Sequence, residues 1–459
     1  MARLEGRIFR AVTPRKADQA LEVLRAPWLQ QLIADGEFPQ TFAVDQPSAA
    51  LRGLGDWLWL EHAALPFPCY PHEITALQLY DSAHLTLKVA TAAALGGWIL
   101  KDASAWNVLH SRGRCVFVDL LSFERQAGVP RWMAYGQFAR HFLLPLMIFR
   151  RLSITPPDVF MSNRDGVTPE RAYELLRVAG ALSPDGLELV LMPKWFAGAG
   201  GRLIEAESRR PPKAVDARLS EDLLVRTLAR LGRTLERLHP DESKAQSTWN
   251  DYEEDRSHYS GPDLEAKKEF VRRNVGGASQ ILDIGCNAGE FSLIALGEGR
   301  SVVSADFDHP ALGKLYRRIR GTNQPITPVL LNLGRPTPAV GWLNREIPSF
   351  LDRAAGQFDC VLFLGLIHHL LVTERASLPM LAELLAHLGP RRLILEWIDP
   401  TDRKFRQLSG VNHGLYELLN AAALEECFRA AQFDLVEKLP LPCGTRVMYV
   451  WRRRGSPER

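Results

Sequence analysis

The sequence predicts an α/β fold for the second half of the chain, with a parallel sheet covered by helices on both faces, after a separate α+β region. Short apolar runs alternate with helical stretches from residue 281 onward, which is typical of such a sheet. A glycine-punctuated turn follows the first run. The 459 residues also exceed what one hydrophobic core usually serves. We therefore expect two domains, residues 1–245 and 246–459.

The composition is that of an ordinary globular protein and narrows the classes of partner. The hydrophobic fraction is 46% and the charged fraction is 24%, which argues against global disorder. A net charge of +3 gives no electrostatic reason to expect a nucleic acid as partner. We expect a small-molecule substrate instead, and the sequence leaves the oligomeric state open.

The cysteines and the apolar runs bear on the compartment. The six cysteines are scattered and lack the paired spacing of a zinc site, so a reducing compartment is expected and no metal site. No apolar run approaches the roughly 20 residues of a membrane span, and no N-terminal signal core is visible. These features predict a cytoplasmic location and no membrane partner.

The first 245 residues combine helices and loops. Apolar and alanine-rich character predicts a helix within 83–100, and an aromatic stripe in 132–148 predicts a buried helix. A glycine- and proline-rich stretch at 197–213 predicts a surface loop or linker. An amphipathic helix is expected over 220–238. The aromatic stripe comprises Phe138, Phe142 and Phe149, and the leucine face of the last helix comprises Leu223, Leu224, Leu228, Leu231 and Leu235.

Strands and helices then alternate to the end of the chain. Ser260 to Asp263 has the pattern of a helix-capping start, and the helix through Val271 leads into the first strand. Two runs at 433–438 and 446–451 flank a Pro-Cys-Gly turn and predict a closing hairpin with an antiparallel edge. The other predicted strands are 281–284, 301–305, 327–331, 359–364 and 393–396, with a helix at 379–388.

The turn after the first strand indicates a cofactor site. Glycines at Gly285 and Gly289 let backbone N–H groups approach a ligand closely, because they carry no Cβ. Asp283 lies on the strand itself, and Asp306 ends the next strand, where a carboxylate can accept both hydroxyls of a ribose. Asp308 is the nearby competitor, and we favour Asp306 because it directly ends the apolar run. The dinucleotide fingerprint Gly-x-Gly-x-x-Gly is absent.

Three parts of this region resemble the motifs of class I S-adenosylmethionine-dependent methyltransferases. They are residues 281–292, Asp306 and the later stretch 358–370. The resemblance implies a Rossmann-like sheet of seven strands with S-adenosyl-L-methionine as the cofactor. Its first motif then lines the methionine part, the second-strand acid holds the ribose, and a residue after the third strand flanks the adenine. Asn287 replaces a common glycine of the family, and Asn332 replaces a common acid. The cofactor-binding candidates are Asp283, Gly285, Cys286, Asn287, Gly289, Asp306, Phe307, Asn332 and Leu364.

Candidate catalytic residues follow the fourth and fifth strands, because ligands of open α/β sheets bind at the carboxyl ends of strands. Methyl transfer needs mainly an in-line approach, and a general base only when the nucleophile arrives protonated. His368 and His369 are the candidates for such a base, since an unperturbed histidine has a pKa near 6.5. They could equally serve the turn and helix start. Glu396 is a third candidate and could equally pair with an arginine such as Arg391 or Arg392.

The N-terminal region offers a second resemblance over about twenty residues. Asp102 and Asn107 have the separation of the catalytic-loop acid and metal-binding amide of protein-kinase-like phosphotransferases, and Asp119 ends the next strand. The resemblance implies an α+β domain related to the kinase C-lobe. The glycine-rich phosphate loop and the strand lysine of that family are missing, as is the histidine before the acid, so a fold that no longer transfers phosphate is the preferred form of this interpretation.

The whole chain also resembles bacterial two-part methyltransferases related to nodulation proteins. The resemblance rests on 100–107, with Leu-Lys-Asp-Ala followed by Asn, and on 118–124, Val-Asp-Leu-Leu-Ser-Phe-Glu. We expect a methyltransferase that acts on a small-molecule or glycan-precursor acceptor. The alternatives are a kinase-like nucleotide-binding protein that uses Asp102, Asn107 and Asp119, and a non-catalytic protein that retains the cofactor.

Overall fold

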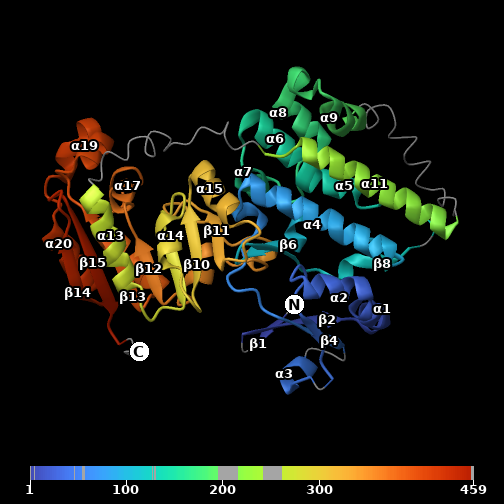
Figure 1. Ribbon diagram of the computed structural model, residues 1–459, viewed down its shortest axis with the longest axis horizontal. Coiled ribbons are helices and arrows are strands. Elements are labelled where there is room, and N and C mark those ends of the chain that lie inside the picture. Colours follow the sequence, from blue (N-terminus) through green and yellow to red (C-terminus); the bar gives the residue numbers. More distant parts are fainter. Residues whose placement is uncertain are drawn as a thin grey trace. The chain divides into compact units, whose positions relative to one another are not determined.

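A computed structural model of the protein describes residues 2–4, 6–45, 47–53, 57–126, 128, 131–194, 216–240 and 261–455. The chain divides into two compact units, Met1–Glu242 and Ser243–Arg459 (Figure 1). The predicted loop at 197–213, the boundary near residue 245 and the capping start at Ser260 lie outside the described residues.

The described residues of the N-terminal unit form three small antiparallel sheets. The largest has the order β1-β2-β4-β3, and two-stranded sheets pair β5 with β8 and β6 with β7. No stretch of alternating strands and crossover helices occurs among its described residues. The unit is therefore α+β, as the sequence predicts. Its strands are β1 (Ala2–Leu4), β2 (Arg7–Val12), β3 (Thr41–Ala43), β4 (Leu58–His62), β5 (Trp98–Leu100), β6 (Val108–Ser111), β7 (Arg114–Phe117) and β8 (Phe123–Arg125).

A long and largely buried helix of this unit is α4 (Ala76–Leu95). It begins at a reciprocal capping box, in which the Thr75 N–H donates to Gln78 Oε1 at 2.9 Å and the Gln78 N–H donates to Thr75 Oγ1 at 3.3 Å. The helix ends at Gly96, and Gly97 takes a φ of 77°. The predicted helix within 83–100 is thus correct up to residue 95 and wrong for 98–100, which form β5.

Two further sequence predictions concern buried helix faces. Phe138, Phe142 and Phe149 are buried core residues, as predicted. They lie on a helical run that passes through a π-helical turn at Ala139–Leu143, just before Pro145, whose missing N–H cannot join an α-helical ladder. In α11 (Ala217–Arg237), four of the five predicted leucines are buried, whereas Leu223 is 38% exposed and lies off the buried face.

The remaining α-helices in the described residues of this unit are shorter than α4, and two of them, α2 (Pro27–Ala34) and α6 (Leu144–Leu152), pack against it. Pro14 and Pro27 open the first two of these shorter helices, where a missing N–H costs no hydrogen bond. They are α1 (Pro14–Arg25), α2 (Pro27–Ala34), α3 (Ala49–Arg52), α5 (Tyr135–Phe138), α6 (Leu144–Leu152), α7 (Pro156–Ser162), α8 (Pro169–Ala181) and α9 (Pro184–Gly186).

The C-terminal unit is built on one seven-stranded sheet with the order β11-β10-β9-β12-β13-β15-β14. The first five strands are parallel, β15 is antiparallel to β13, and β14 forms the antiparallel edge. The Rossmann-like seven-stranded sheet and its closing hairpin are therefore confirmed. The strands are β9 (Gln280–Ile284), β10 (Ser301–Asp306), β11 (Ile326–Leu330), β12 (Cys360–Phe363), β13 (Arg392–Ile398), β14 (Phe433–Pro440) and β15 (Arg446–Arg453).

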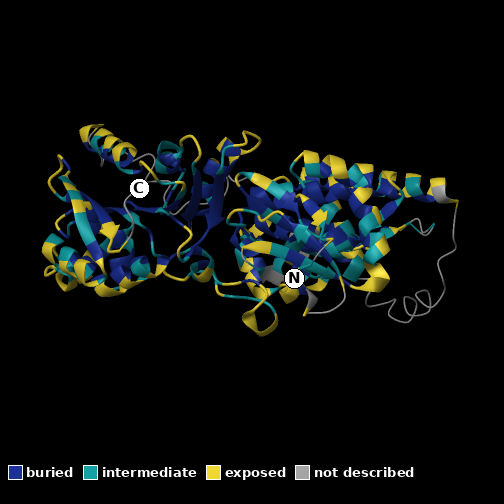
Figure 2. Cartoon of the chain, turned by 90° about the horizontal axis from the view of Figure 1, so that it is seen from below, coloured by how far each residue is buried: buried dark blue, intermediate teal, exposed yellow. Residues whose placement is uncertain are grey.

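Helices cover both faces of this sheet. Every residue of β10, β11 and β12 is buried, which requires cover on both sides (Figure 2). In β14, by contrast, partly buried and exposed residues alternate from Leu435 onward. No helix among the described residues is long and apolar enough to cross a membrane. The helices are α13 (Gly261–Asn274), α14 (Glu290–Ala295), α15 (His309–Ile319), α16 (Phe350–Ala354), α17 (Ile367–Val372), α18 (Leu378–Leu388), α19 (Arg403–Ser409) and α20 (Ala421–Ala430).

Candidate active site

The turn between β9 and α14 forms a cradle of backbone groups at the carboxyl edge of the sheet. Gly285 and Gly289 take φ values of 77° and 79°, a region that side chains disfavour. A Cβ on Gly289 would lie 2.4 Å from Leu315 Cδ1, so only glycine lets α15 pack this closely beneath the turn. The glycines therefore serve both the turn and its packing.

Asn287 takes the left-handed conformation that the sequence predicts for the position of a lost glycine, with a φ of 50°. Its Oδ1 accepts a hydrogen bond from the Ala288 N–H at 2.6 Å. Its own N–H donates to Asp306 Oδ2 at 2.7 Å, which links the first motif to the end of the second strand. The local bond of the amide side chain explains why asparagine is tolerated here.

Asp306 ends β10 beside this turn. Its two oxygens accept hydrogen bonds from the backbone N–H groups of Asn287 and Asp308, at 2.7 and 2.8 Å. Each carboxylate oxygen has two lone pairs, so both can accept a further hydroxyl. Burial raises the pKa of Asp306 to about 6. The competitor Asp308 instead caps α15, where its Oδ1 accepts from the Ala311 N–H at 2.9 Å.

Asp283 lies beneath the turn and is almost fully buried. Its Oδ2 accepts the Ser292 hydroxyl at 2.6 Å, and Ser292 Oγ in turn accepts from the Ser304 hydroxyl at 2.8 Å. Burial raises the pKa of Asp283 to about 6, with a smaller contribution from the negative charge of Asp306. Two carboxylates with raised pKa values thus flank one turn.

The other cofactor candidates lie at the same edge. The Cys286 side chain is buried, and burial raises its pKa well above the usual range, so the thiol is a packing group. Phe307 directly follows β10 and is 43% exposed, and Leu364 directly follows β12 and is buried. Asn332, which follows β11, donates from Nδ2 to Glu374 at 3.4 Å and accepts from the Gly334 N–H at 2.8 Å.

Several kinds of cofactor bind at a glycine-rich turn. The strand order, the acid-flanked turn and a comparison with known protein families decide between them. A family described as "Methyltransferase domain" matches residues 226–438. The enzyme is an S-adenosylmethionine-dependent methyltransferase, and its C-terminal unit resembles the class I family. Its cofactor is S-adenosylmethionine.

A relative of this methyltransferase spans most of the chain. "Nodulation protein NoeA" of Rhizobium meliloti (strain 1021) is 27% identical over 405 residues, which cover 86% of this chain and 82% of the relative. Two solved structures cover less than half of the chain. The N-methyltransferase NodS of Bradyrhizobium japonicum WM9 is 16% identical, covering 43% of this chain and 99% of its own, with a TM-score of 0.31. Magnesium protoporphyrin IX methyltransferase of Synechocystis PCC 6803 is 18% identical, covering 42% and 83%, with a TM-score of 0.30.

The two histidines of this methyltransferase stack against one another on α17, with ring centroids 4.0 Å apart. Burial lowers the pKa of His369 to about 4, with a contribution from the nearby Lys404, and lowers the pKa of His368 well below its usual range. Both rings are therefore neutral at neutral pH. Among the described residues, His368 Nδ1 is buried without a hydrogen-bond partner. The rings can accept a proton only weakly, and they can accept a hydrogen bond.

Glu396 is fully buried on β13 and forms ion pairs. Its Oε2 accepts from Lys267 Nζ at 2.6 Å and its Oε1 from an Arg446 guanidinium nitrogen at 3.4 Å. The sequence expectation of an arginine partner is correct in kind, but Arg391 and Arg392 are the wrong arginines. Arg391 instead pairs with Asp359, and Arg392 donates to the backbone carbonyl of Asn274 at 2.6 Å.

Sequence reasoning missed three residues beside the histidines. Lys267 and Arg446 are the partners of Glu396, and Arg446 also pairs with Asp402 at 2.9 Å. One signal was available for Lys267, because it shares a helical face with Asp263, Phe270 and Val271, all buried. A lysine on an apolar helical face needs an acidic partner. No local signal identifies Arg446 or Asp402.

The kinase-like residues of the N-terminal unit are occupied by protein partners. Asp119 forms an ion pair with Arg10 and accepts the Ser122 hydroxyl. Asn107 Nδ2 donates to the Asp102 carbonyl at 3.3 Å and to Ser122 Oγ at 3.5 Å. No group of three or more His, Cys, Asp or Glu side chains that could hold a metal ion occurs in the part of the chain that the structure describes. Nothing here supports nucleotide binding.

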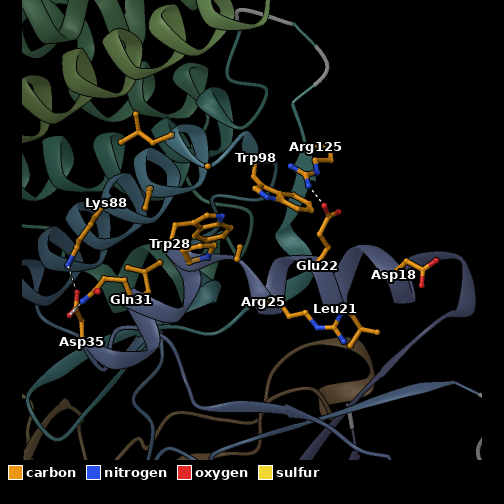
Figure 3. Close-up of a pocket in the computed structure, with 16 residues that line it drawn as sticks. Asp18, Leu21, Glu22, Arg25, Trp28, Gln31, Asp35, Lys88, Trp98 and Arg125 are labelled. Atoms are coloured by element: carbon orange, nitrogen blue, oxygen red, sulfur yellow. Dashed lines mark hydrogen bonds and ion pairs between the residues drawn. The ribbon is translucent and has the colours of Figure 1, made fainter.

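The N-terminal unit also contains a cavity of about 900 Å³ between α1, α2, α4 and β5 (Figure 3). Trp28 and Trp98 form much of its apolar wall. Trp28 packs against Gly96 so closely that a Cβ there would lie 2.3 Å from its ring. The Arg125 guanidinium lies 4.3 Å from the Trp98 ring centroid. The wall is therefore held by contacts within the unit.

Internal ion pairs neutralise most of the charges that line this cavity, and the other two, Asp18 and Arg25, are opposite in sign. Arg125 pairs with Glu22, and Lys88 pairs with Asp35 at 3.5 Å, as Figure 3 shows. Lys88 also pairs with Glu37 at 2.6 Å. The charges that line the cavity therefore do not select a ligand of one sign.

Proposed function

We propose that the enzyme transfers the methyl group of S-adenosylmethionine to a small-molecule or glycan-precursor acceptor at the carboxyl edge of the C-terminal sheet. The proposal assigns methyl transfer to residues 246–459 and treats residues 1–245 as an accessory domain. A sulfonium methyl is electrophilic when bound, so the chain has to position the acceptor in line with it and exclude water.

The observation that carries the proposal is the meeting of Asp306 with the glycine-rich turn. The Asn287 N–H to Asp306 bond ties the two motifs together and leaves lone pairs of both Asp306 oxygens for a ribose. The proposed cofactor contacts come from the turn and the three neighbouring strand ends. They are Asp283, Gly285, Cys286, Asn287, Gly289, Asp306, Phe307, Asn332 and Leu364.

On the acceptor side, we assign the role of proton acceptor to His369 as the first candidate and to His368 as the second. His369 is partly exposed and neutral at neutral pH, because burial holds its pKa at about 4. A base this weak suits an acceptor whose proton becomes acidic only as the new bond to carbon forms. Glu396 is not assigned as a base, because both of its oxygens are engaged by buried cations.

Calorimetry with S-adenosylhomocysteine tests the cofactor site. We expect the wild-type protein to bind it saturably and Asp306→Ala to bind about 100-fold more weakly, because two charge-assisted hydrogen bonds to the ribose are lost. The matched control is Asp434→Ala, which removes an exposed aspartate on the far edge strand β14. Unchanged affinity in Asp306→Ala would overturn the assignment. A screen of metabolites with labelled methyl donor then identifies the acceptor.

A further inference from the structure

We propose that four buried charges, Lys267, Glu396, Arg446 and Asp402, form a positioning device that couples the cofactor cradle to the acceptor side of the sheet. We call them the charge relay. The inference rests on the proposed function, because it uses the cradle as the cofactor site. Its members are positioning residues, since none of them lies in the cradle.

The relay is continuous and alternates in sign. Lys267 Nζ lies 2.6 Å from Glu396 Oε2, and the other oxygen of Glu396 lies 3.4 Å from Arg446. Arg446 Nε lies 2.9 Å from Asp402 Oδ2. The four side chains come from α13, β13, β15 and the loop before α19. The relay therefore joins four separate elements of the unit.

Burial makes the geometry of the relay strict. The side chains of Lys267, Glu396 and Arg446 are 4%, 0% and 3% exposed. A buried charge is tolerated only while a partner of opposite sign and good geometry compensates it. The two cations and two anions sum to zero, so a displacement of one member leaves its neighbours uncompensated. Movement at one end of the relay is thus opposed at the other.

One end of the relay contacts the cradle helix. α13 carries Lys267 and Lys268, and Lys268 pairs with Glu290, the first residue of α14, at 3.0 Å. Lys267 Nζ also lies 4.7 Å from the ring centroid of Phe291 on α14. α14 begins directly after Gly289 of the cradle. A ligand that orders the cradle therefore acts on α13 through two neighbouring lysines.

The other end of the relay sets the start of α19. Asp402 caps this helix, since its Oδ1 accepts from the Lys404 N–H at 2.8 Å. α19 presents Phe405, which is fully buried, to the His368 ring at 6.4 Å and to the Tyr416 ring at 5.5 Å between centroids. The relay thus fixes α19, which packs behind His368 and His369, the two residues proposed as bases.

Hydrogen exchange of α19 with and without S-adenosylhomocysteine tests the coupling. In the wild-type protein, saturating ligand is expected to slow amide exchange at 403–409 by about tenfold, although the ligand binds at the cradle. The double variant Lys267→Met/Glu396→Gln removes one cation and one anion, so Arg446 and Asp402 still balance. We expect it to bind the ligand within about threefold of wild type and to lose the protection of 403–409.

A matched control and a second variant keep the result decisive. Arg272→Met/Glu269→Gln makes the same kinds of change at an exposed pair on α13 and should keep the protection. Asp402→Asn keeps a residue that caps helices while removing the charge that faces Arg446, so it should also lose the protection, even if the double variant does not fold.

The outcomes separate the inference from the function on which it rests. A wild-type protein that fails to bind S-adenosylhomocysteine would refute the proposed cofactor site. Binding without slower exchange at 403–409 would refute only the coupling. Full protection in a folded Lys267→Met/Glu396→Gln variant, or in Asp402→Asn, would likewise refute the role of the relay.

Discussion

The two units use aspartates at strand ends in opposite ways. In the C-terminal unit, no Lys or Arg among the described residues forms an ion pair with Asp283 or Asp306, and both have pKa values of about 6 because of burial. In the N-terminal unit, Asp119 lies after β7 and forms an ion pair with Arg10. An acid that meets only neutral donors keeps its negative charge for a ligand, whereas an acid paired with an internal cation does not.

The same contrast exists within the C-terminal unit. Glu396 and Asp402 are buried like Asp306, but cations of the relay neutralise them. Acids that hold the fold together and acids that hold a ligand are thus distinguished by their partners and not by burial. Removing the cation that pairs with an acid of the first kind should lower stability, whereas changing an acid of the second kind should lower ligand affinity.

The largest effect is expected from Arg446→Met. This change leaves Glu396 with one cation and Asp402 without its buried partner, which should lower the free energy of unfolding of the C-terminal unit by about 3–5 kcal/mol. Calorimetric melting measures it, since S-adenosylhomocysteine identifies the C-terminal transition by raising its temperature. Arg454→Met removes an exposed ion pair with Asp434 and should cost less than about 1 kcal/mol. Similar losses in both variants would contradict the argument.

Mild acid is expected to destabilise the N-terminal unit next most strongly. Burial lowers the pKa values of His62, His110 and His141 to about 4, 3 and 4. A lowered histidine pKa gives stability that is present above the unfolded value of about 6.5 and is lost as the pH falls toward the folded value. With three such groups, the loss at about pH 5.5 reaches up to about 4 kcal/mol.

The C-terminal unit should change much less over the same range. His368 and His369 have lowered pKa values, but Asp283 and Asp306 have raised ones and gain stability as the pH falls through about 6. The two calorimetric transitions should therefore separate on acidification, with the N-terminal one falling first. Parallel shifts of both transitions would count against this assignment of the buried groups.

The sequence predicts one kind of acid well and the other poorly. Asp283 and Asp306 are recognisable because each lies in or after an apolar run beside a glycine-rich turn. The relay depends on pairs separated by 129, 50 and 44 positions, and no local pattern identifies such partners. The partner of Asp119 is equally hidden from local patterns, since Arg10 lies 109 positions away. The sequence predicts the strands because their periodicity is a local pattern. It does not predict ion pairs between residues that are far apart in the chain.

A smaller effect is expected from Arg10→Met, which frees Asp119 from its cation. The pair is partly buried, with side chains 15% and 18% exposed, so the loss of stability of the N-terminal unit should be about 1–2 kcal/mol. Magnesium-ATP binding should not appear, because Asp102 and Asn107 remain bonded to protein groups. Calorimetry with magnesium-ATP checks this. Saturable binding of magnesium-ATP by Arg10→Met would mean that the ion pair with Arg10 is all that keeps Asp119 from binding a ligand.

The smallest effect is the pH dependence of cofactor affinity. Asp306 and Asp283 have pKa values of about 6, so both are mostly ionised at about pH 7.5 and mostly protonated at about pH 5.5. Protonation of Asp306 removes an acceptor for the ribose, and protonation of Asp283 removes a negative charge beneath the cradle. We expect the affinity for S-adenosylhomocysteine to fall about fourfold over this range.

The affinity for S-adenosylmethionine should fall further over the same range, because its sulfonium carries a positive charge that the thioether lacks. In Asp306→Asn, the affinity for S-adenosylhomocysteine should depend less on pH. The affinity for S-adenosylmethionine should still fall with the pH, because Asp283 is still present and still titrates. Equal losses of affinity for the two ligands in the wild-type protein would mean that Asp283 does not act on the sulfonium and serves the fold through its hydrogen bond with Ser292. Asp306 would then be the one acid of this pair that acts on the ligand, in contrast to Asp119.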